Sequence, residues 1–231
     1  MYAVVPAAGV GRRMQSDVPK QYLSLNGKTV IEHTLDRLLS VEHINKIVVV
    51  VAEHDDVWPT LDLSSHPKIL TAPGGDERCH SVLNGLELIK QDVEDGWVLV
   101  HDAARPCVRK ADIQRLIATA QQHEVGGILA APVRDTLKKA GVDNAVAETI
   151  DRKNLWHAFT PQMFRLSLLT NALHDALANS VIVTDEAQAI ERSGFAPLLI
   201  EGETDNVKIT QPADLALAAL YLDYQAAADK P

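Results

Sequence analysis

The 231-residue sequence has only two cysteines, no long apolar run and no internal repeat. Cys79 and Cys107 lack the spacing of a metal site or a redox pair, so we interpret both as reduced thiols. No segment is apolar over the length that a membrane span requires, so we expect no contact with a membrane. The amino terminus lacks the basic segment of a secretory signal, which predicts a cytoplasmic protein.

The sequence also lacks an excess of basic residues, because its formal net charge is −9. This balance argues against nucleic acid as a partner. The basic residues are unevenly spread, however. The first 28 residues contain Arg12, Arg13, Lys20 and Lys28 but a single acid, Asp17. A basic segment in an acidic protein indicates a compact anionic ligand rather than a polyanion.

Apolar segments alternate with amphipathic segments along the chain. Several of the apolar segments are apolar at nearly every position, which is typical of strands covered on both faces. The alternation predicts an α/β fold with a Rossmann-like, mostly parallel sheet, helices on both faces and a ligand at the carboxyl ends of the strands. We expect strands at 2–6, 46–52, 68–72, 97–102, 126–133 and 196–202, and helices at 30–40, 79–91, 110–123, 163–177, 185–194 and 212–225, the last of them in the core.

Residues 133–162 depart from this alternation. The short alternating segments DTLKKA and AVAETID flank GVDN, a pattern typical of a β-hairpin. We expect a projecting β-arm over residues 133–153 on a single domain that spans residues 1–231. An arm with apolar residues on one face needs a partner, so we predict a homodimer that forms through it.

The segment PAAGVGRRM follows the first predicted strand. Gly9 and Gly11 allow backbone N–H groups to approach a phosphate, although two glycines are equally compatible with a structural turn. The third glycine of a dinucleotide fingerprint is missing, and no Walker A sequence follows. Arg12, Arg13 and the later Lys20 are the cations that a triphosphate needs; the alternative is two solvated surface arginines.

Two further loops follow predicted strands. In PGGDERCHS, Asp76 and Ser81 offer polar contacts for a base or ribose, and Asp76 is also a candidate cap for the next helix. In VLVHDAARP, Asp102 ends a predicted strand, where either a Mg²⁺ ligand or a simple turn former would lie. We interpret His101 as structural rather than catalytic.

A family resemblance rests on motifs that follow in order over almost the whole chain. They are PAAGVGRRM, PKQYL, GGDERCHSVLNGL, VLVHDAARP, VRDTLKK, TIDRKNLWHAFTPQ, VTDEAQAIERSG and DNVKITQPADLALA. The sequence resembles the 2-C-methyl-D-erythritol 4-phosphate cytidylyltransferases. The resemblance implies Mg²⁺-dependent transfer of CMP from CTP to methylerythritol phosphate, with release of pyrophosphate, in the non-mevalonate route to isoprenoid precursors. The substrate's own phosphate is the nucleophile, so no general base is needed.

The resemblance, together with the loops above, implies roles for particular residues. The catalytic residues would be Arg13, Lys20, Arg152 and Lys208. The nucleotide would contact Ala7, Ala8, Gly9, Gly11, Arg12, Gly75, Asp76 and Ser81. The second substrate would contact Asp102, Arg105, Thr136, Thr160 and Thr184. Asp102 and Asp205 are the metal candidates, although Asp205 could instead order its own loop. In that family the arm reaches the neighbouring subunit's site, so Arg152 would act in trans.

Two other functions stay open at this point. A ribitol 5-phosphate cytidylyltransferase would use the same apparatus for CTP and differ around Thr136, Arg152 and Thr184. A nucleotide-binding regulator without chemistry could keep the glycine-rich loops. Such a regulator would have no reason to keep four widely separated cations, at Arg13, Lys20, Arg152 and Lys208.

Overall fold

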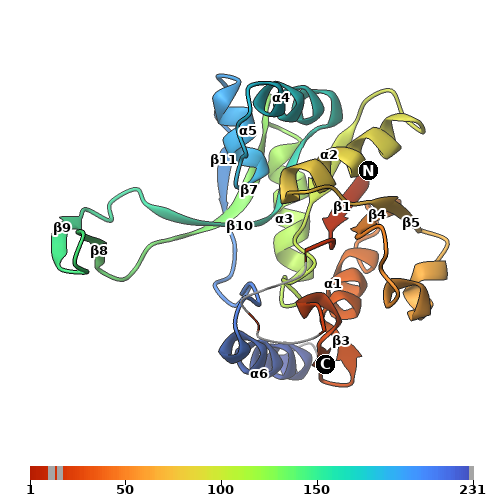
Figure 1. Cartoon of the computed structure of the whole chain (residues 1–231), viewed down its shortest axis with the longest axis horizontal. Helices are drawn as coiled ribbons and strands as arrows, with labels where there is room; N and C mark the ends of the chain where they lie inside the picture. Colours follow the sequence, from red (N-terminus) through yellow and green to blue (C-terminus); the bar gives the residue numbers. More distant parts are fainter. Residues whose placement is uncertain (10–13, 15–17, 229–231) are drawn as a thin grey trace.

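A seven-stranded sheet forms the centre of the molecule (Figure 1). The computed structural model describes residues 1–9, 14 and 18–228. The strand order is β11-β7-β10-β6-β1-β4-β5, and every pairing is parallel except those of β10 with β6 and β7. The strands are β1 (Tyr2–Pro6), β4 (Lys46–Val51), β5 (Ile69–Pro73), β6 (Trp97–Val100), β7 (Gly126–Pro132), β10 (Trp156–Arg165) and β11 (Leu198–Glu201). The expected α/β fold with a mostly parallel sheet is confirmed.

Helices cover both faces of this sheet, which explains the uniformly apolar strands. In β4, Val48 and Val50 pack in one core cluster, whereas Ile47 and Val49 pack in another on the opposite face. Side chains alternate across a strand, so burial on both faces requires an apolar residue at every position. The first cluster contains α2 (Arg78–Lys90), α4 (Leu166–Ala178) and α5 (Glu186–Arg192), and the second contains α1 (Val30–Leu39) and α3 (Lys110–Ala120).

The last helix, α6 (Pro212–Ala228), is only partly buried. Ala218 and Leu222 pack in a third cluster with Leu25, which belongs to the small antiparallel pair of β2 (Ser24–Leu25) and β3 (Lys28–Thr29). The opposite side of α6 exposes Leu217, Leu220 and Tyr224. The expectation that this helix lies in the core is therefore wrong: it packs by one side on the loops beside the sheet.

Within the described central sheet, β10 is the strand that the sequence pattern did not reveal. We expected a helix from residue 163, but residues up to Arg165 belong to β10, and α4 begins at Leu166. Thr160 and Gln162 are buried in this strand beside Met163 and Phe164. A buried strand that contains polar residues and Pro161 lacks the apolar run that marks its neighbours, so periodicity alone does not detect it.

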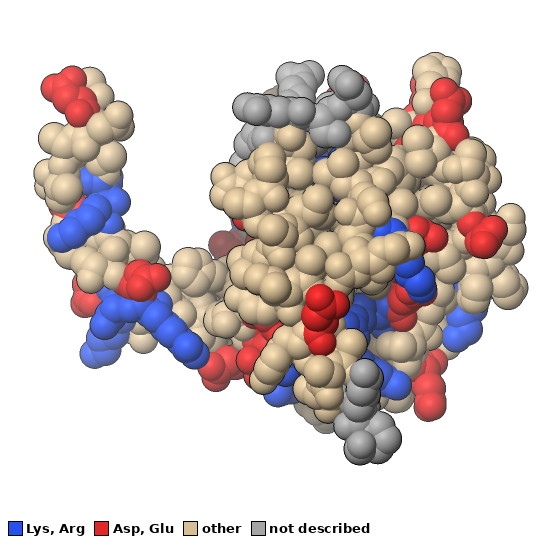
Figure 2. All heavy atoms as spheres, turned by 90° about the horizontal axis from the view of Figure 1, so that it is seen from below, with Lys and Arg blue, Asp and Glu red and all other residues tan. Residues whose placement is uncertain are grey.

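The expected β-arm is confirmed. β8 (Leu137–Ala140) and β9 (Val146–Ile150) form an antiparallel hairpin, and Asn144 takes a φ of 56° in its turn. The hairpin stands away from the body of the molecule in Figures 1 and 2, and Val142 and Val146 are exposed on it. The single domain and the homodimer stay predictions. Among the described residues, no helix has both the length and the apolar character needed to cross a bilayer.

Candidate active site

Two adjacent cavities open at the carboxyl ends of β1 and β6, the edge at which the sequence predicted a ligand. The first has a volume of about 300 Å³. It is lined by Pro6, Ala7, Ala8, Gly9, Lys20, Gln21, Gly75, Asp76, Glu77, Arg78, Ser81, Asp102, Ala103, Ala104 and Lys208. Chain segments that lie far apart in the sequence thus converge on one cavity. It includes every described residue that we assigned to the nucleotide; Gly11, Arg12 and Arg13 lie outside the described residues.

The first loop is fixed by hydrogen bonds to its backbone. The Ala7 N–H donates to the Val50 carbonyl oxygen at 2.7 Å, and Gln21 Nε2 donates to the Ala7 carbonyl oxygen at 2.6 Å. Lys20 Nζ donates to the Ile209 carbonyl oxygen at 3.1 Å. Lys20 therefore ties the first loop to the segment that carries Lys208, which lies near the other end of the sequence.

The second loop packs closely against the first. A Cβ atom on Gly74 would lie 2.4 Å from the Ala8 Cβ atom and 3.1 Å from the Val51 carbonyl oxygen, so this close approach requires glycine. The Gly75 N–H donates to Ser81 Oγ at 3.1 Å. The residue that caps α2 is Glu77, so the alternative role of Asp76 as the cap is wrong. Asp76 lines the cavity instead.

The second cavity, of about 240 Å³, lies beside the first. It is lined by Arg78, Asp102, Arg105, Ala158, Phe159, Thr160, Gln162, Thr184, Asp185 and Lys208. Four of the five residues that we assigned to the second substrate meet here. Three described residues line both cavities, and these are Arg78, Asp102 and Lys208. The boundary between the cavities is therefore built from two cations and one carboxylate.

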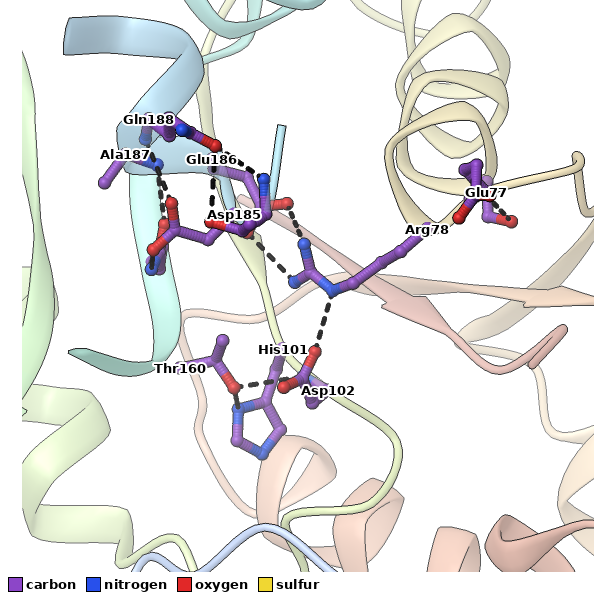
Figure 3. A network of polar contacts seen from close by, with 12 residues as sticks. Glu77, Arg78, His101, Asp102, Thr160, Asp185, Glu186, Ala187 and Gln188 are labelled. Atoms are coloured by element: carbon purple, nitrogen blue, oxygen red, sulfur yellow. Dashed lines mark hydrogen bonds and ion pairs between the residues drawn. The ribbon is translucent and has the colours of Figure 1, made fainter. Parts of the chain in front are cut away.

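Asp102 is the centre of that boundary. It is buried, with 6 % of its surface exposed. Its Oδ1 accepts from Arg78 Nε at 2.9 Å, and its Oδ2 lies 2.8 Å from Lys208 Nζ and 3.4 Å from Arg105 Nε (Figure 3 shows the Arg78 contact). Burial alone would raise the pKa of Asp102, but the three cations hold it well below its ordinary value. Asp102 is thus an ionised carboxylate at neutral pH and no proton donor.

Arg105 and Thr160 are held in place around Asp102. Arg105 Nη1 donates to the Asn206 carbonyl oxygen at 2.7 Å, and its guanidinium lies 5.4 Å from the centre of the Phe159 ring. Thr160 Oγ1 accepts from the Asp102 N–H at 3.1 Å. These contacts tie β10 and the 204–210 segment to the end of β6, which fixes the wall of the second cavity.

His101 supports this wall from inside the protein. It is fully buried, its Nε2–H donates to the Arg105 carbonyl oxygen at 3.1 Å, and its Nδ1 accepts from Thr160 Oγ1 at 2.9 Å (Figure 3 shows the Thr160 contact). Burial lowers the pKa of His101 from 6.5 to about 4. The imidazole is therefore neutral at pH 7, and both of its nitrogens serve hydrogen bonds within the protein. This agrees with the structural role that the sequence predicted.

Thr136 and Arg152 lie apart from both cavities. They belong to the segment that carries the arm, and neither residue is part of the described lining of the two cavities. Arg152 is exposed, and its Nη1 donates to the Arg134 carbonyl oxygen. Among the described residues Arg152 forms no ion pair with the nearby Asp151 or Glu148, and Glu148 lies 4.0 Å from Lys139 Nζ instead.

The two metal candidates differ sharply. Asp205 Oδ2 accepts from Arg109 Nη2 at 2.6 Å and from Gln225 Nε2 at 2.9 Å, and the described lining of the cavities does not include Asp205. These contacts agree with the alternative role of Asp205 in ordering its loop. Asp102 is ionised and borders both cavities. Among the described residues no group of three or more His, Cys, Asp or Glu side chains that could hold a metal ion occurs.

Sequence reasoning missed the partner of Arg78. Arg78 Nη1 and Nη2 donate to Oε1 and Oε2 of Glu186 at 2.7 and 3.1 Å (Figure 3). The signal was present in GGDERCHS: a basic residue begins a helix, where the helix dipole favours an acid. Such a residue indicates a carboxylate partner elsewhere in the chain. The identity of the partner, more than 100 residues away, follows only from the fold.

Comparisons with known proteins show the family to which the chain belongs. The family model described as 2-C-methyl-D-erythritol 4-phosphate cytidylyltransferase matches residues 1–224. The chain is similar to proteins of that name from Vibrio atlanticus (54 % identity over 220 residues, 95 % of this chain and 94 % of the relative) and Tolumonas auensis (53 % over 223 residues, 96 % of each). It is also similar to the crystal structure of the Francisella tularensis protein, with a TM-score of 0.84, 38 % identity and coverage of 95 % and 98 %. The chain belongs to the 2-C-methyl-D-erythritol 4-phosphate cytidylyltransferase family of nucleotidyltransferases.

Proposed function

We propose that this chain transfers CMP from CTP to 2-C-methyl-D-erythritol 4-phosphate at the boundary between the two cavities. The products are 4-diphosphocytidyl-2-C-methyl-D-erythritol and pyrophosphate. The observation that carries the proposal is the sharing of Arg78, Asp102 and Lys208 by both cavities. Two anionic substrates repel each other, so a reaction between them requires cations at the place where they meet.

We assign CTP to the first cavity. The small residues Ala7, Ala8 and Gly9 leave room for a pyrimidine, and a Cβ atom on Gly9 would meet none of the described residues within 4 Å. The second loop adds Gly75, Asp76 and Ser81 to the same lining. Lys20 lies in the same lining, where its ammonium can bind the triphosphate. By the family resemblance, Arg12 and Arg13 contribute further cations from outside the described residues.

We assign methylerythritol phosphate to the second cavity. Arg105 and Lys208 supply positive charge for its phosphate, and Thr160 and Thr184 supply hydroxyl groups. The phosphate is already ionised near neutral pH and attacks the α-phosphorus directly, so the protein needs no general base. Its contribution is alignment of the two phosphates and neutralisation of the charge that develops on pyrophosphate, for which Lys20 and Arg13 are the assigned groups.

We assign the magnesium site to Asp102. A Mg²⁺ ion bound there would neutralise oxygens of the triphosphate and draw its remaining ligands from phosphate and water. Asp102 fits this role because its carboxylate is ionised and reaches both cavities. Lys208 and Arg78 already balance the charge of Asp102, so the carboxylate stays ordered before an ion arrives.

We further propose that the protein is a cytoplasmic homodimer in which the arm of one copy completes the second cavity of the other. Thr136 and Arg152 are carried on a segment that stands clear of its own body (Figure 2). Exposed Val142 and Val146 give this arm apolar surface for a second copy. In this assignment Arg152 binds the phosphate of methylerythritol phosphate across the subunit boundary.

A pyrophosphate-release assay tests the proposed function. CTP with methylerythritol phosphate should release pyrophosphate, whereas CTP with ribitol 5-phosphate should release far less. Faster turnover of ribitol 5-phosphate would assign the chain to the alternative substrate. Binding of CTP without pyrophosphate release from either mixture would overturn the enzymatic assignment and favour a nucleotide-binding regulator.

A further inference from the structure

Arg78 occupies a position where a cation is electrostatically unfavourable. It is the first residue of α2, and the N-terminus of a helix carries partial positive charge. Its guanidinium is held by carboxylates from two other elements. Nε donates to Oδ1 of Asp102 at 2.9 Å, and Nη1 and Nη2 make two parallel bonds to Glu186 at 2.7 and 3.1 Å (Figure 3). The helix gains nothing from this arginine, so the reason for its presence lies in these contacts.

Glu186 is buried, with 1 % of its side chain exposed. It begins α5 and lies outside the described lining of both cavities, so it reaches the boundary through Arg78. A buried ion pair contributes little net stability, because desolvation of the two charges offsets their attraction. Two parallel hydrogen bonds do, however, fix the plane and direction of a guanidinium. The contact between Glu186 and Arg78 therefore contributes more to the orientation of the guanidinium than to the stability of the fold.

The contacts continue from Arg78 to the boundary between the cavities. Arg78 holds Oδ1 of Asp102, and the other oxygen of that carboxylate, Oδ2, lies 2.8 Å from Lys208 Nζ. A rotation or shift of the Asp102 carboxylate would move the Lys208 ammonium with it. An ångström of misplacement at a reacting centre is enough to lower a rate by about 10²-fold.

We propose that Glu186 and Arg78 are positioning residues for the CMP transfer assigned above, on which this inference rests. Glu186 orients Arg78, Arg78 fixes Asp102, and Asp102 sets the place of Lys208 between the two substrates. The two carboxylates also compete with phosphate for Arg78.

Glu186→Gln is the first test, because glutamine keeps the shape of glutamate but loses its charge and one acceptor oxygen. We expect kcat for pyrophosphate release to fall about 10²-fold, as for a misaligned reacting group. The KM for CTP should change by less than about threefold, because the contacts to the nucleotide are kept. Glu191→Gln, on the exposed side of the same helix, is the matched control and should keep the wild-type kcat.

Arg78→Lys is the second test, because lysine keeps the positive charge but cannot form the two parallel bonds. We expect it to lower kcat about as much as Glu186→Gln. The double variant should be no slower than either single variant, since both residues act through one chain of contacts. Glu186→Asp keeps both oxygens and the charge, and it should regain part of the kcat that glutamine loses.

Melting curves of each variant separate positioning from folding. A wild-type kcat in folded Glu186→Gln or Arg78→Lys would overturn the proposal, as would full additivity in the double variant. Should Glu186→Gln fail to fold, Arg78→Lys and Glu186→Asp decide the matter by the same criteria. Wild-type protein assayed in parallel reports on the proposed function itself: no pyrophosphate release from wild type rejects that function, whereas release by wild type and variants alike rejects only the positioning role.

Discussion

Lys208 and Arg152 are both assigned to the phosphate of the second substrate, yet their surroundings contrast. Lys208 lies 2.8 Å from a buried carboxylate that two arginines also contact. Arg152 is exposed on the segment of the arm, and its Nη1 donates to a backbone carbonyl oxygen. The body of the protein thus arranges its cations before substrate arrives. The arm presents its cation on an exposed segment that stands away from the body.

This contrast separates two kinds of contribution to catalysis. A group held in place before binding acts most strongly on the transition state, because it needs no reorganisation as charge develops. A group on an exposed hairpin contributes chiefly to holding the substrate. We therefore expect substitutions in the body to lower kcat and substitutions in the arm to raise the KM of methylerythritol phosphate.

Lys20→Ala should have the largest effect. Loss of a cation beside the developing pyrophosphate should lower kcat about 10²- to 10³-fold, as for the removal of other preorganised electrostatic groups. The measurement is steady-state pyrophosphate release, with a melting curve to show that the fold is intact. Lys28→Ala is the matched control, because Lys28 forms an exposed ion pair with Asp36 and should leave kcat unchanged. A folded Lys20→Ala variant with near-normal kcat would remove Lys20 from the mechanism.

Because His101 is buried in the body of the protein, the free energy of unfolding should depend on pH through this residue. The folded pKa of about 4 lies below the ordinary 6.5, so the unfolded chain binds the proton more readily than the folded one. The contribution to stability is complete above pH 6.5 and is lost as the pH falls towards 4. Over that range it should amount to about 3 kcal/mol of unfolding free energy.

Denaturant unfolding of wild type and His101→Gln at several pH values isolates this effect. The difference between the two proteins should shrink as the pH falls from 6.5 to 4, because other titrating groups cancel in the subtraction. His54→Gln, at an exposed histidine, is the matched control. A difference between wild type and His101→Gln that stays constant over this range contradicts the assignment of a buried, neutral imidazole.

Arg152→Ala should have a smaller effect of a different kind. Loss of one charged hydrogen bond to the phosphate should raise the KM of methylerythritol phosphate about tenfold or more. The KM of CTP should stay within about twofold, because the nucleotide lies in the other cavity. Lys153→Ala removes a neighbouring exposed cation and should leave both values unchanged. Equal increases in both KM values for Arg152→Ala would place this residue at the nucleotide rather than at the acceptor.

Much of the fold could be predicted from the sequence, because burial on both faces makes strands such as β4 uniformly apolar. The arm was predictable from its alternating segments and turn residues. β10 was not, since Thr160, Pro161 and Gln162 interrupt its apolar pattern. These polar side chains are buried because they brace the cavities: Gln162 Nε2 donates to Asp185 Oδ2 at 2.9 Å. The polar residues that the cavities require thus replace the apolar pattern by which the strand would have been predicted.

The site was predictable to the extent that its residues follow strands at one edge of the sheet. Ala7, Gly75 and Asp102 meet there because the carboxyl ends of parallel strands lie side by side. The direction in which a side chain points could not be predicted in this way. Asp205 lies three residues before Lys208 but turns towards Arg109 and Gln225 instead of the cavities. The pairing of Arg78 with Glu186 likewise depends on packing between distant helices, which no local pattern encodes.

Subunit complementation tests most directly the claim that a prearranged body and a borrowed arm together form one site. Lys20→Ala and Arg152→Ala proteins are mixed, and subunit exchange is verified with two affinity tags. Each hybrid dimer then contains one site with both substitutions and one intact site. With methylerythritol phosphate well below its KM, where each variant alone is slow, activity should recover to about a quarter of the wild-type value at equal mixing, because half of the dimers are hybrids and each has one intact site. No recovery in a mixture with proven exchange would contradict the account and place Lys20 and Arg152 in the same chain's site.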